Sequence, residues 1–327
     1  MADLLENLTT HIETLATAIG ERNYKRYREL DDAARYIESA FRDAGCEPRS
    51  QEYTARGQRF RNIEVEFRAD NDCAGILVIG AHYDTEHGSP GANDNASGIA
   101  AVIEIARVLQ NVKVQRTLRL VAFVNEERPF LRTPKMGSYV YAKACRLNND
   151  RIDGMISLET IGFKSEKQRL SLAGLLMPSR GDFIAVVGNR RSRELTRKCD
   201  RMLRRRSGLR VQSRSLPGLL PGVKSSDHWS FWKQGFRAVM ITDTAPLRYP
   251  HYHHATDTPD KICYPFLRDV VEAVQDLALQ AATEGVPLTL SRNSGSAAKR
   301  SNWKLPVYAA LTLSGLVAVA TLGRLRK

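Results

Sequence analysis

The sequence predicts an α/β fold with a mostly parallel, mixed sheet that carries helices on both faces. Short apolar runs of strand length alternate with amphipathic runs of helical length, and several apolar runs stop at a histidine or an acidic residue. Strands that alternate with helices form parallel sheets. In open sheets of this kind, ligands bind beyond the carboxyl ends of the strands. The polar residues that follow the predicted strands are therefore candidates for a binding site.

The bulk composition is that of a globular protein. The chain has 327 residues, of which 43% are hydrophobic and 26% are charged, and this excludes a disordered chain. Its five cysteines lie far apart without a Cys-x-x-Cys pair, so we predict neither a disulfide framework nor a thiolate zinc site. Residues 1–16 contain acids and lack a continuous apolar run, so we expect no secretion signal.

Residues 1–50 are predicted to be helical. The clearest helix is Asp31–Gly45, where apolar residues recur at helical spacing between an acidic start and a glycine stop. Alternating apolar residues over Asn62–Ala69 predict an edge or outer strand. The apolar run from Gly75 predicts a strand that ends at His82, and a helix is expected over Ser97–Leu109.

Strands and helices continue to alternate in the second half. The strand Thr117–Val124 stops at Asn125-Glu126-Glu127, and the short strand Gly154–Leu158 stops at Glu159. A turn-rich loop over Tyr249–Thr258 contains three histidines. The remaining expected elements are a helix over Lys135–Cys145, a strand over Phe183–Gly188 that leads into a basic helix, a helix over Ser225–Gly235, a strand over Ala238–Thr242 and a last helix over Pro265–Glu284.

Most of the positive charge lies in one segment. The formal net charge is +13, and the segment Arg190–Arg214 contains eleven basic residues against Glu194 and Asp200. No recognition motif or interleaved aromatic residue accompanies this segment, so we predict no nucleic-acid partner. Two interpretations remain open, namely a solvated helix face and contact with an anionic lipid surface.

The composition changes after a predicted globular domain over residues 1–288. Residues 289–304 form a polar, basic linker. Residues 305–323 contain no charge, and at 1.5 Å per residue a helix of this length would reach about 28 Å, close to the hydrocarbon thickness of a bilayer. We therefore expect a single-pass transmembrane helix with a basic tail at 324–327. With no signal before it, this segment would act as a tail anchor and leave the domain over residues 1–288 in the cytoplasm.

Metal-type ligands occur at several strand ends. The loop Ala81–Gly98 carries His82, Asp84, His87 and Asp94. Further candidates follow the other strands, and they are Glu126, Glu127, Glu159 and the histidines at 251, 253 and 254. Histidines with carboxylates and without sulfur are typical of a hydrolytic zinc site rather than a structural one. More carboxylates than one ion needs indicate two metal ions that share a carboxylate.

The two adjacent glutamates can have different roles. Because neighbouring residues leaving a strand point in different directions, one of Glu126 and Glu127 can bind metal while the other faces the reacting water. The second carboxylate can then accept a proton and deliver it to the leaving amine.

The motifs GAHYDT, PGANDNASG, NEE, SLETIG, SDHWSFW and PHYHHATDT resemble a known family over roughly residues 30–285. They are similar to the co-catalytic zinc exopeptidases of the bacterial leucyl aminopeptidase and glutamate carboxypeptidase type, metallopeptidase family 28. This resemblance implies a phosphorylase/hydrolase-like zinc exopeptidase fold and two Zn²⁺ ions. His82 and Glu159 would bind the first ion, Glu127 and His253 the second, and Asp94 would bridge both.

The same resemblance implies further roles. Glu126 would be the general base, and Asp84 would orient His82. The pattern His-x-x-x-Asp-Thr selects His253 as the closing ligand, with His254 as its neighbour. A cis peptide bond is expected between Asp94 and the residue that follows it.

Other positions are less closely tied to the family pattern. Many members of the family carry Asp where this chain has Glu159. Asp227 and His228 would lie near the substrate cleft, or would cap the helix that begins at Ser225-Ser226.

The sequence thus predicts a metal-dependent exopeptidase that acts on peptides, an aminopeptidase with two zinc ions that is tethered to a membrane. A single-zinc glutaminyl cyclase and a carboxypeptidase on the same fold are the enzymatic alternatives. A non-catalytic, receptor-like relative is the alternative from another class. The expected ligand positions and the base are all filled in this sequence, which disfavours that last reading.

Overall fold

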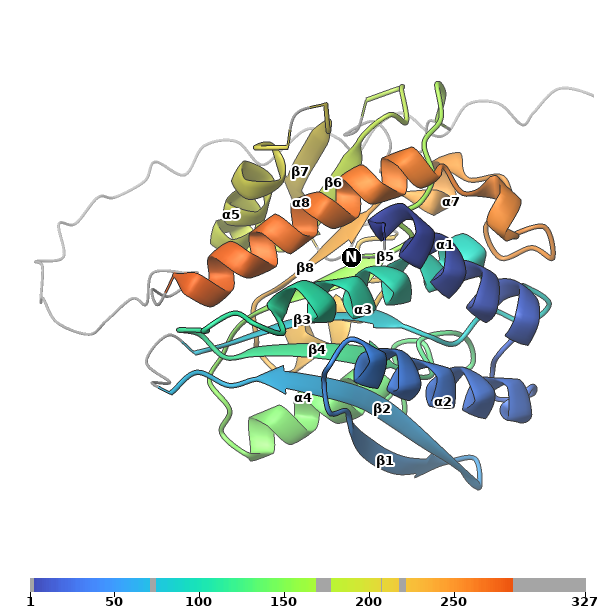
Figure 1. Cartoon of the computed structure of the whole chain (residues 1–327), viewed down its shortest axis with the longest axis horizontal. Coiled ribbons are helices and arrows are strands. Elements are labelled where there is room, and N and C mark those ends of the chain that lie inside the picture. The colour runs from blue at the N-terminus through green and yellow to red at the C-terminus, as the bar shows by residue number, and fades with distance from the viewer. Residues whose placement is uncertain (1–2, 71–74, 169–177, 207, 218–221, 285–327) are drawn as a thin grey trace, which may run out of the picture. The chain divides into compact units, whose positions relative to one another are not determined.

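An eight-stranded mixed sheet is the framework of the described residues (Figure 1). The computed structural model describes residues 3–70, 75–168, 178–206, 208–217 and 222–284, which lie in the first of two units of the chain, residues 1–290. The strand order is β1-β2-β4-β3-β5-β8-β6-β7. The strands are β1 (Arg49–Ala55), β2 (Gln58–Phe67), β3 (Ile76–His82), β4 (Leu118–Phe123), β5 (Ile152–Glu159), β6 (Ile184–Gly188), β7 (Val211–Ser215) and β8 (Ala238–Thr242).

The centre of the sheet is parallel and its flanks are mixed. Strand β3 pairs in parallel with β4 and β5, β5 pairs in parallel with β8, and β6 pairs in parallel with β7. Strand β2 runs antiparallel to β1 and β4, and β6 runs antiparallel to β8. The predicted mixed α/β sheet is therefore confirmed.

Helices cover both faces of this sheet. Leu77 and Ile79 of β3 belong to the core beneath α1, α2, α3 and α8, whereas Ile76 and Val78 belong to the core beneath α4 and α6. Alternate side chains of a strand point to opposite faces, so a strand covered on both sides is apolar throughout. The helices and helical turns are α1 (Leu4–Glu13), η1 (Thr14–Ile19), α2 (Tyr27–Asp43), η3 (Ala92–Ala96), α3 (Ser97–Leu109), α4 (Gly137–Leu147), η5 (Arg190–Ser192), α5 (Arg193–Leu203), α6 (His228–Lys233), α7 (Ala245–Arg248), η6 (Pro259–Lys261) and α8 (Tyr264–Thr283).

Strand β2 is not the edge or outer strand that its alternating pattern predicted. It lies between β4 and β1. Strand β1 itself was not predicted from the sequence. The two strands form a hairpin through Arg56 and Gly57, which have φ values of 48° and 77°. Positive φ at both central residues is the geometry of a two-residue hairpin turn. Strand β1 was missed because its residues, RSQEYTA, are mostly polar and exposed.

The basic segment is helical only over its first half. Helix α5 ends at Leu203, and the chain then returns as β7, which pairs along β6. Only Val211 of strand β7 is fully buried. Because the rest of the strand is polar, the sequence pattern did not distinguish it from the solvated basic segment.

None of the helices among the described residues is long and apolar enough to cross a bilayer. The expected linker over 289–304, transmembrane helix over 305–323 and tail over 324–327 lie outside the described residues.

A buried guanidinium connects the first helices to the loop after β3. The side chain of Arg22 is fully buried and bridges the turn that follows η1 and the loop beyond Tyr83. Its nitrogens donate hydrogen bonds to five carbonyl oxygens, those of Leu15, Gly20, Tyr83, Pro90 and Gly91. The backbone of Arg22 is also paired with Thr85 in both directions. Arg22 therefore fixes the course of the loop that begins at the end of β3.

We predict that Arg22→Met lowers the free energy of unfolding by roughly 3–5 kcal/mol, because it leaves buried carbonyl oxygens without donors. Urea unfolding measures this change. The matched control is Arg26→Met, since the Arg26 side chain is 59% exposed and its nearest ion-pair partner lies 3.8 Å away. The control should shift stability by no more than about 0.5 kcal/mol. Equal effects of the two substitutions would contradict this account of Arg22.

Candidate metal centre

Neighbouring strands deliver polar side chains to one edge of the sheet. Strand β3 ends at His82, which is paired in register with Phe123 at the end of β4, so the chain beyond β4 brings Glu126 and Glu127 to the same edge. Strand β5 ends at Glu159. The histidine loop reaches this edge from the opposite end of the sequence. The structure brings these residues together at one edge of the sheet, as expected.

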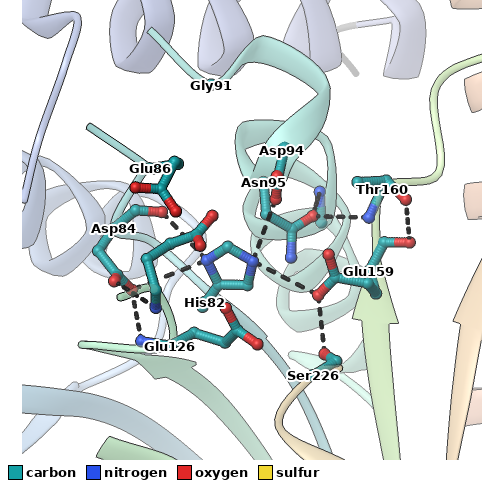
Figure 2. Close-up of polar contacts among 12 residues, drawn as sticks. His82, Asp84, Glu86, Gly91, Asp94, Asn95, Glu126, Glu159, Thr160 and Ser226 are labelled. Carbon is teal, nitrogen blue, oxygen red and sulfur yellow. Dashed lines mark hydrogen bonds and ion pairs between the residues drawn. The ribbon is translucent and has the colours of Figure 1, made fainter. Parts of the chain in front are cut away.

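Two histidine–carboxylate groups share the carboxylate of Asp94. In the first, Nε2 of His82 lies 3.3 Å from Oδ1 of Asp94 and 3.4 Å from Oε2 of Glu159 (Figure 2). In the second, Nε2 of His253 lies 3.2 Å from Oδ2 of Asp94 and 3.4 Å from Oε1 of Glu127. Each oxygen of Asp94 thus faces a different imidazole.

The atoms between these groups fit metal ions. Both oxygens of Asp94 and Nε2 of each histidine are buried and form no hydrogen bond with the described residues. Two ligand atoms of one tetrahedral zinc ion, each about 2.1 Å from the metal, lie about 3.4 Å apart. The measured separations match that spacing, and imidazole nitrogen with carboxylate oxygen is a donor set that zinc accepts.

The tautomer of His82 is set by the backbone. Nδ1 of His82 lies 3.0 Å from the carbonyl oxygen of Asp84, which can only accept a hydrogen bond. Nδ1 therefore carries a proton, and Nε2 is the ring nitrogen that faces Asp94 and Glu159. Metal-binding histidines are commonly oriented by such a bond from their second nitrogen.

The carboxylate of Asp84 was expected to orient His82, but its hydrogen bonds are to the backbone of the glutamate pair. Its Oδ1 lies 3.7 Å from Nδ1 of His82, while its two oxygens accept hydrogen bonds of 3.0 Å from the backbone N–H groups of Glu126 and Glu127. The carbonyl of Asp84 orients His82, and its carboxylate fixes the backbone of the glutamate pair. One residue thus positions both sides of the site.

The loop that carries Asp94 is held by polar side chains from distant parts of the chain. The peptide bond between Asp94 and Asn95 is cis, as the resemblance implied. The backbone N–H groups of Asn93 and Asp94 donate to the carboxylate of Asp257, and the Asn95 amide donates to the carbonyl of Leu158. These contacts fix Asp94 between the two histidines.

The electrostatics of the cluster favour added positive charge. Burial raises the pKa of Glu127 to about 7 and that of Glu126 well above its usual value, and neighbouring carboxylates add to both shifts. Burial alone would lower the pKa of His82, but Glu159 and other carboxylates outweigh it and raise that pKa well above its usual value. A cluster that draws protons this strongly also attracts metal cations.

Two of the other histidine candidates point away from the cluster. His254 is exposed, so His253 is the histidine that faces Asp94, as the spacing predicted. His87 is also exposed, and its Nδ1 contacts Glu21 at 2.9 Å.

Asp227 and His228 lie in the interior of the domain. Both side chains are completely buried, as is that of His82. Nε2 of His228 donates to the carbonyl of Val223, and its ring packs edge-on against Trp232. Asp227 precedes α6 but makes no side-chain capping hydrogen bond, so it does not cap that helix. Burial raises the pKa of Asp227 to about 7, and its charge interactions with His82 and Glu159 show that it lies close to the cluster.

Sequence reasoning missed several residues that support the site. Asp257 was read only as part of a spacing pattern, although its carboxylate also accepts a 2.6 Å hydrogen bond from Tyr249. Ser226 donates a 2.7 Å hydrogen bond to Oε2 of Glu159 (Figure 2). The ring of Tyr252 stacks on His253 with 3.8 Å between ring centroids. Ser226, Tyr252 and Asp257 all lie within the sequence motifs, but a motif does not reveal the direction of a side chain.

A cavity of about 490 Å³ adjoins the histidine loop. Its wall includes Tyr252 and His254, the two neighbours of His253. Burial raises the pKa of Tyr252 well above its usual value, and the carboxylates of Asp94 and Glu127 add to the shift. Tyr252 therefore contacts both the cavity and the ring of His253.

The fold and the paired histidine–carboxylate groups define a metallopeptidase. The chain belongs to peptidase family M28, whose family model matches residues 62–278. A protein of Escherichia coli K12, the uncharacterized protein YfbL, is 34% identical over 283 residues, which cover 82% of this chain and 86% of that protein. Several other relatives are longer, and the chain covers between 19% and 55% of their length.

Solved structures share the fold at low sequence identity. The structure of BSAP, a zinc aminopeptidase from Bacillus subtilis, has a TM-score of 0.68 and 16% identity over 86% of this chain and 95% of that chain. A glutaminyl cyclase of Bacteroides thetaiotaomicron has a TM-score of 0.63 and 15% identity over 84% of this chain and 97% of that one.

We predict that Asp84→Asn weakens zinc binding about 10- to 100-fold, since residues that hold metal ligands contribute on that scale. An amide offers one acceptor where the carboxylate offers two, so the backbone N–H of Glu126 or Glu127 would face a donor. Zinc titration against a competing chelator measures the change. Glu21→Gln is the control, because Glu21 contacts the exposed His87 rather than the cluster. Unchanged zinc affinity in Asp84→Asn would disprove this role.

Proposed function

We propose that this protein is a di-zinc aminopeptidase that removes residues from the amino terminus of peptides. The observation that carries the proposal is the pair of histidine–carboxylate groups that share Asp94, with four unpartnered ligand atoms between them. A single-ion site would need only one such group.

The proposed ligand sets follow from these separations. His82 and Glu159 would hold one zinc ion, Glu127 and His253 would hold the other, and Asp94 would bridge them. Zinc bound here would polarise the scissile carbonyl group and make water more acidic. The side chain of Glu159 is held in place by a hydrogen bond from the hydroxyl of Ser226.

Glu126 is the proposed proton carrier. One of its carboxylate oxygens lies within 4.8 Å of ligand atoms of His82 and Glu127, so it faces the same space without belonging to either group that shares Asp94. Its carboxylate would take a proton from the attacking water and return it to the nitrogen of the leaving amine. The hydrogen bond from its backbone N–H to Asp84 holds Glu126 in place for both transfers.

The likeness to a zinc aminopeptidase supports the amino-terminal direction of cleavage. The glutaminyl cyclase fold is the nearest rival, and a carboxypeptidase is the next. Zinc counting separates the cyclase from the peptidase, and hydrolysis of free aminoacyl anilides separates the two directions of cleavage.

We predict that Glu126→Gln binds two zinc ions per chain but turns over leucine 4-nitroanilide about 10²–10⁴-fold more slowly than the unmodified protein. The amide keeps the size of the side chain and removes its ability to accept a proton. Elemental analysis gives the zinc content, and initial rates give the turnover.

The contrasting variant is Asp94→Asn, which removes charge from the shared carboxylate and should lower the zinc content. Treatment with a chelator should abolish activity, and added zinc should restore it. Activity near that of the unmodified protein in Glu126→Gln, or in the chelated protein, would refute the proposed mechanism.

We further propose that residues 305–323 tether the domain to a membrane and that α5 faces the anionic lipid surface. The uncharged length of the segment supports the tether. Arg193, Arg197 and Arg201 on α5 are exposed and have no ion-pair partner among the described residues. Near an anionic leaflet each basic residue contributes about 1 kcal/mol. A cytoplasmic location of the domain is part of this proposal.

We predict that removing residues 305–327 leaves full peptidase activity and a weak association with anionic vesicles that disappears at high salt. Arg197→Glu combined with Arg201→Glu should abolish that residual association, and neutral vesicles are the control. Protease protection on intact cells or spheroplasts tests the orientation. Digestion of the domain from outside would rule out the cytoplasmic location and this role of the arginines.

A further inference from the structure

The cavity beside the histidine loop has a lining that the proposed chemistry does not use. It is formed by the chain that follows β5 and by the chain from α7 to the histidine loop. Its volume of about 490 Å³ lies within the range of small-molecule sites, about 300–1,000 Å³. Tyr252 lies on its wall and stacks on His253, so an occupant of the cavity would sit next to the cluster.

The charge of this cavity is opposite to that of the cluster. Lys167, Arg248 and His254 contribute to its wall, and the described residues that line it include no acidic side chain. Lys167 and His254 are exposed at its rim. The neighbouring cluster, by contrast, is built mainly from carboxylates. An anionic group is therefore the complementary occupant of the cavity.

Arg248 has an unused hydrogen-bond donor. The residue is only 6% exposed. Its Nη1 donates to the carbonyls of Gly181 and Phe183, and its Nε donates to Thr244, but its Nη2 has no partner among the described residues. Burial lowers the pKa of Arg248 to about 10, and the charges of Asp243 and Asp182 oppose that shift. Guanidinium donors without partners are suited to carboxylates.

The rest of the wall suits a short apolar arm. The rings of Phe163 and Tyr249 lie 4.8 Å apart, and Leu247 contributes an aliphatic surface. A methylene chain could pack against these side chains while its charged end reaches the basic residues.

We propose that this cavity binds a carboxylate of the substrate, carried on a short aliphatic arm, and that its source is the acidic side chain of the amino-terminal residue to be removed. The proposal rests on the aminopeptidase function proposed above and narrows it to substrates with amino-terminal glutamate or aspartate. The basic lining would disfavour lysine at the same position. The other source of the same chemistry is the α-carboxylate of a carboxyl-terminal residue.

The test compares substrates that differ only in charge. The zinc-loaded protein is assayed with 4-nitroanilides of glutamate, its neutral isostere glutamine, leucine and lysine. The expected kcat/KM for glutamate exceeds that for glutamine roughly ten- to hundredfold, the range of a hydrogen bond to a charged group. A ratio near one would overturn the proposal.

A pair of exposed lysines provides a matched set of variants. Lys167→Glu should remove the preference for glutamate and raise kcat/KM for lysine, while kcat/KM for leucine stays within about twofold. Lys164→Glu is the control, since Lys164 is exposed nearby but does not line the cavity, and it should keep the preference. Equal changes in both variants would contradict the assignment. Arg248→Met should lose the preference as well, with its thermal melting checked because Arg248 is buried.

Binding of glutarate to the metal-free protein tests the cavity without catalysis. Calorimetry should detect glutarate, and Lys167→Glu should weaken its binding at least tenfold whereas Lys164→Glu should not. No binding in the unmodified protein would count against the cavity. If leucine 4-nitroanilide is hydrolysed without preference for glutamate, the cavity proposal fails while the aminopeptidase proposal stands.

The remaining arm separates the two sources of the carboxylate. An N-acetylated peptide with a carboxyl-terminal glutamate should not be cleaved. Cleavage of this peptide that depends on Lys167, without hydrolysis of any aminoacyl anilide, would assign the cavity to an α-carboxylate and refute the aminopeptidase proposal.

Discussion

The chemistry of this fold depends on the carboxylate of Asp94, which lies between two imidazoles and hydrogen-bonds to neither. A buried carboxylate without a hydrogen-bonding partner is costly, and its two oxygens are compensated only when cations lie beside them. The surrounding structure maintains this arrangement. Asp257 holds the backbone that precedes Asp94, Asn95 ties the loop to β5, and Arg22 fixes the course of the same loop. The site is therefore a property of the whole domain rather than of one loop.

The positions of the cluster could be predicted from sequence because they follow strands with strong patterns. The apolar run before His82 and the run before Glu126 could only be buried strands, and parallel neighbours end at the same edge. The His-x-x-x-Asp-Thr pattern of the family that the sequence resembles selected His253, and this histidine faces Asp94. Elements with weak patterns were missed. Strands β1 and β7 are polar and lie at the edges of the sheet, where pairing with one neighbour is enough to hold them.

Hydrogen bonds to the backbone and the burial of individual side chains could not be predicted from sequence. The carboxylate of Asp84 serves the N–H groups of two glutamates, a role that depends on how closely β3 and β4 approach. Asp227 and His228 occur in a polar motif, but both side chains are completely buried at the start of helix α6. The basic cavity joins Lys167 to Arg248, which are 81 residues apart in the sequence. Only the fold brings these groups together, and the same holds for the contrast in charge between the cavity and the cluster.

The central claim is that one carboxylate serves two metal ions, and anomalous diffraction at the zinc absorption edge tests it most directly. In crystals grown with zinc, the account predicts two anomalous peaks, one beside each oxygen of Asp94. The first should be shared with His82 and Glu159, and the second with Glu127 and His253. A single peak in fully zinc-loaded crystals, or two peaks of which only one contacts Asp94, would contradict the account.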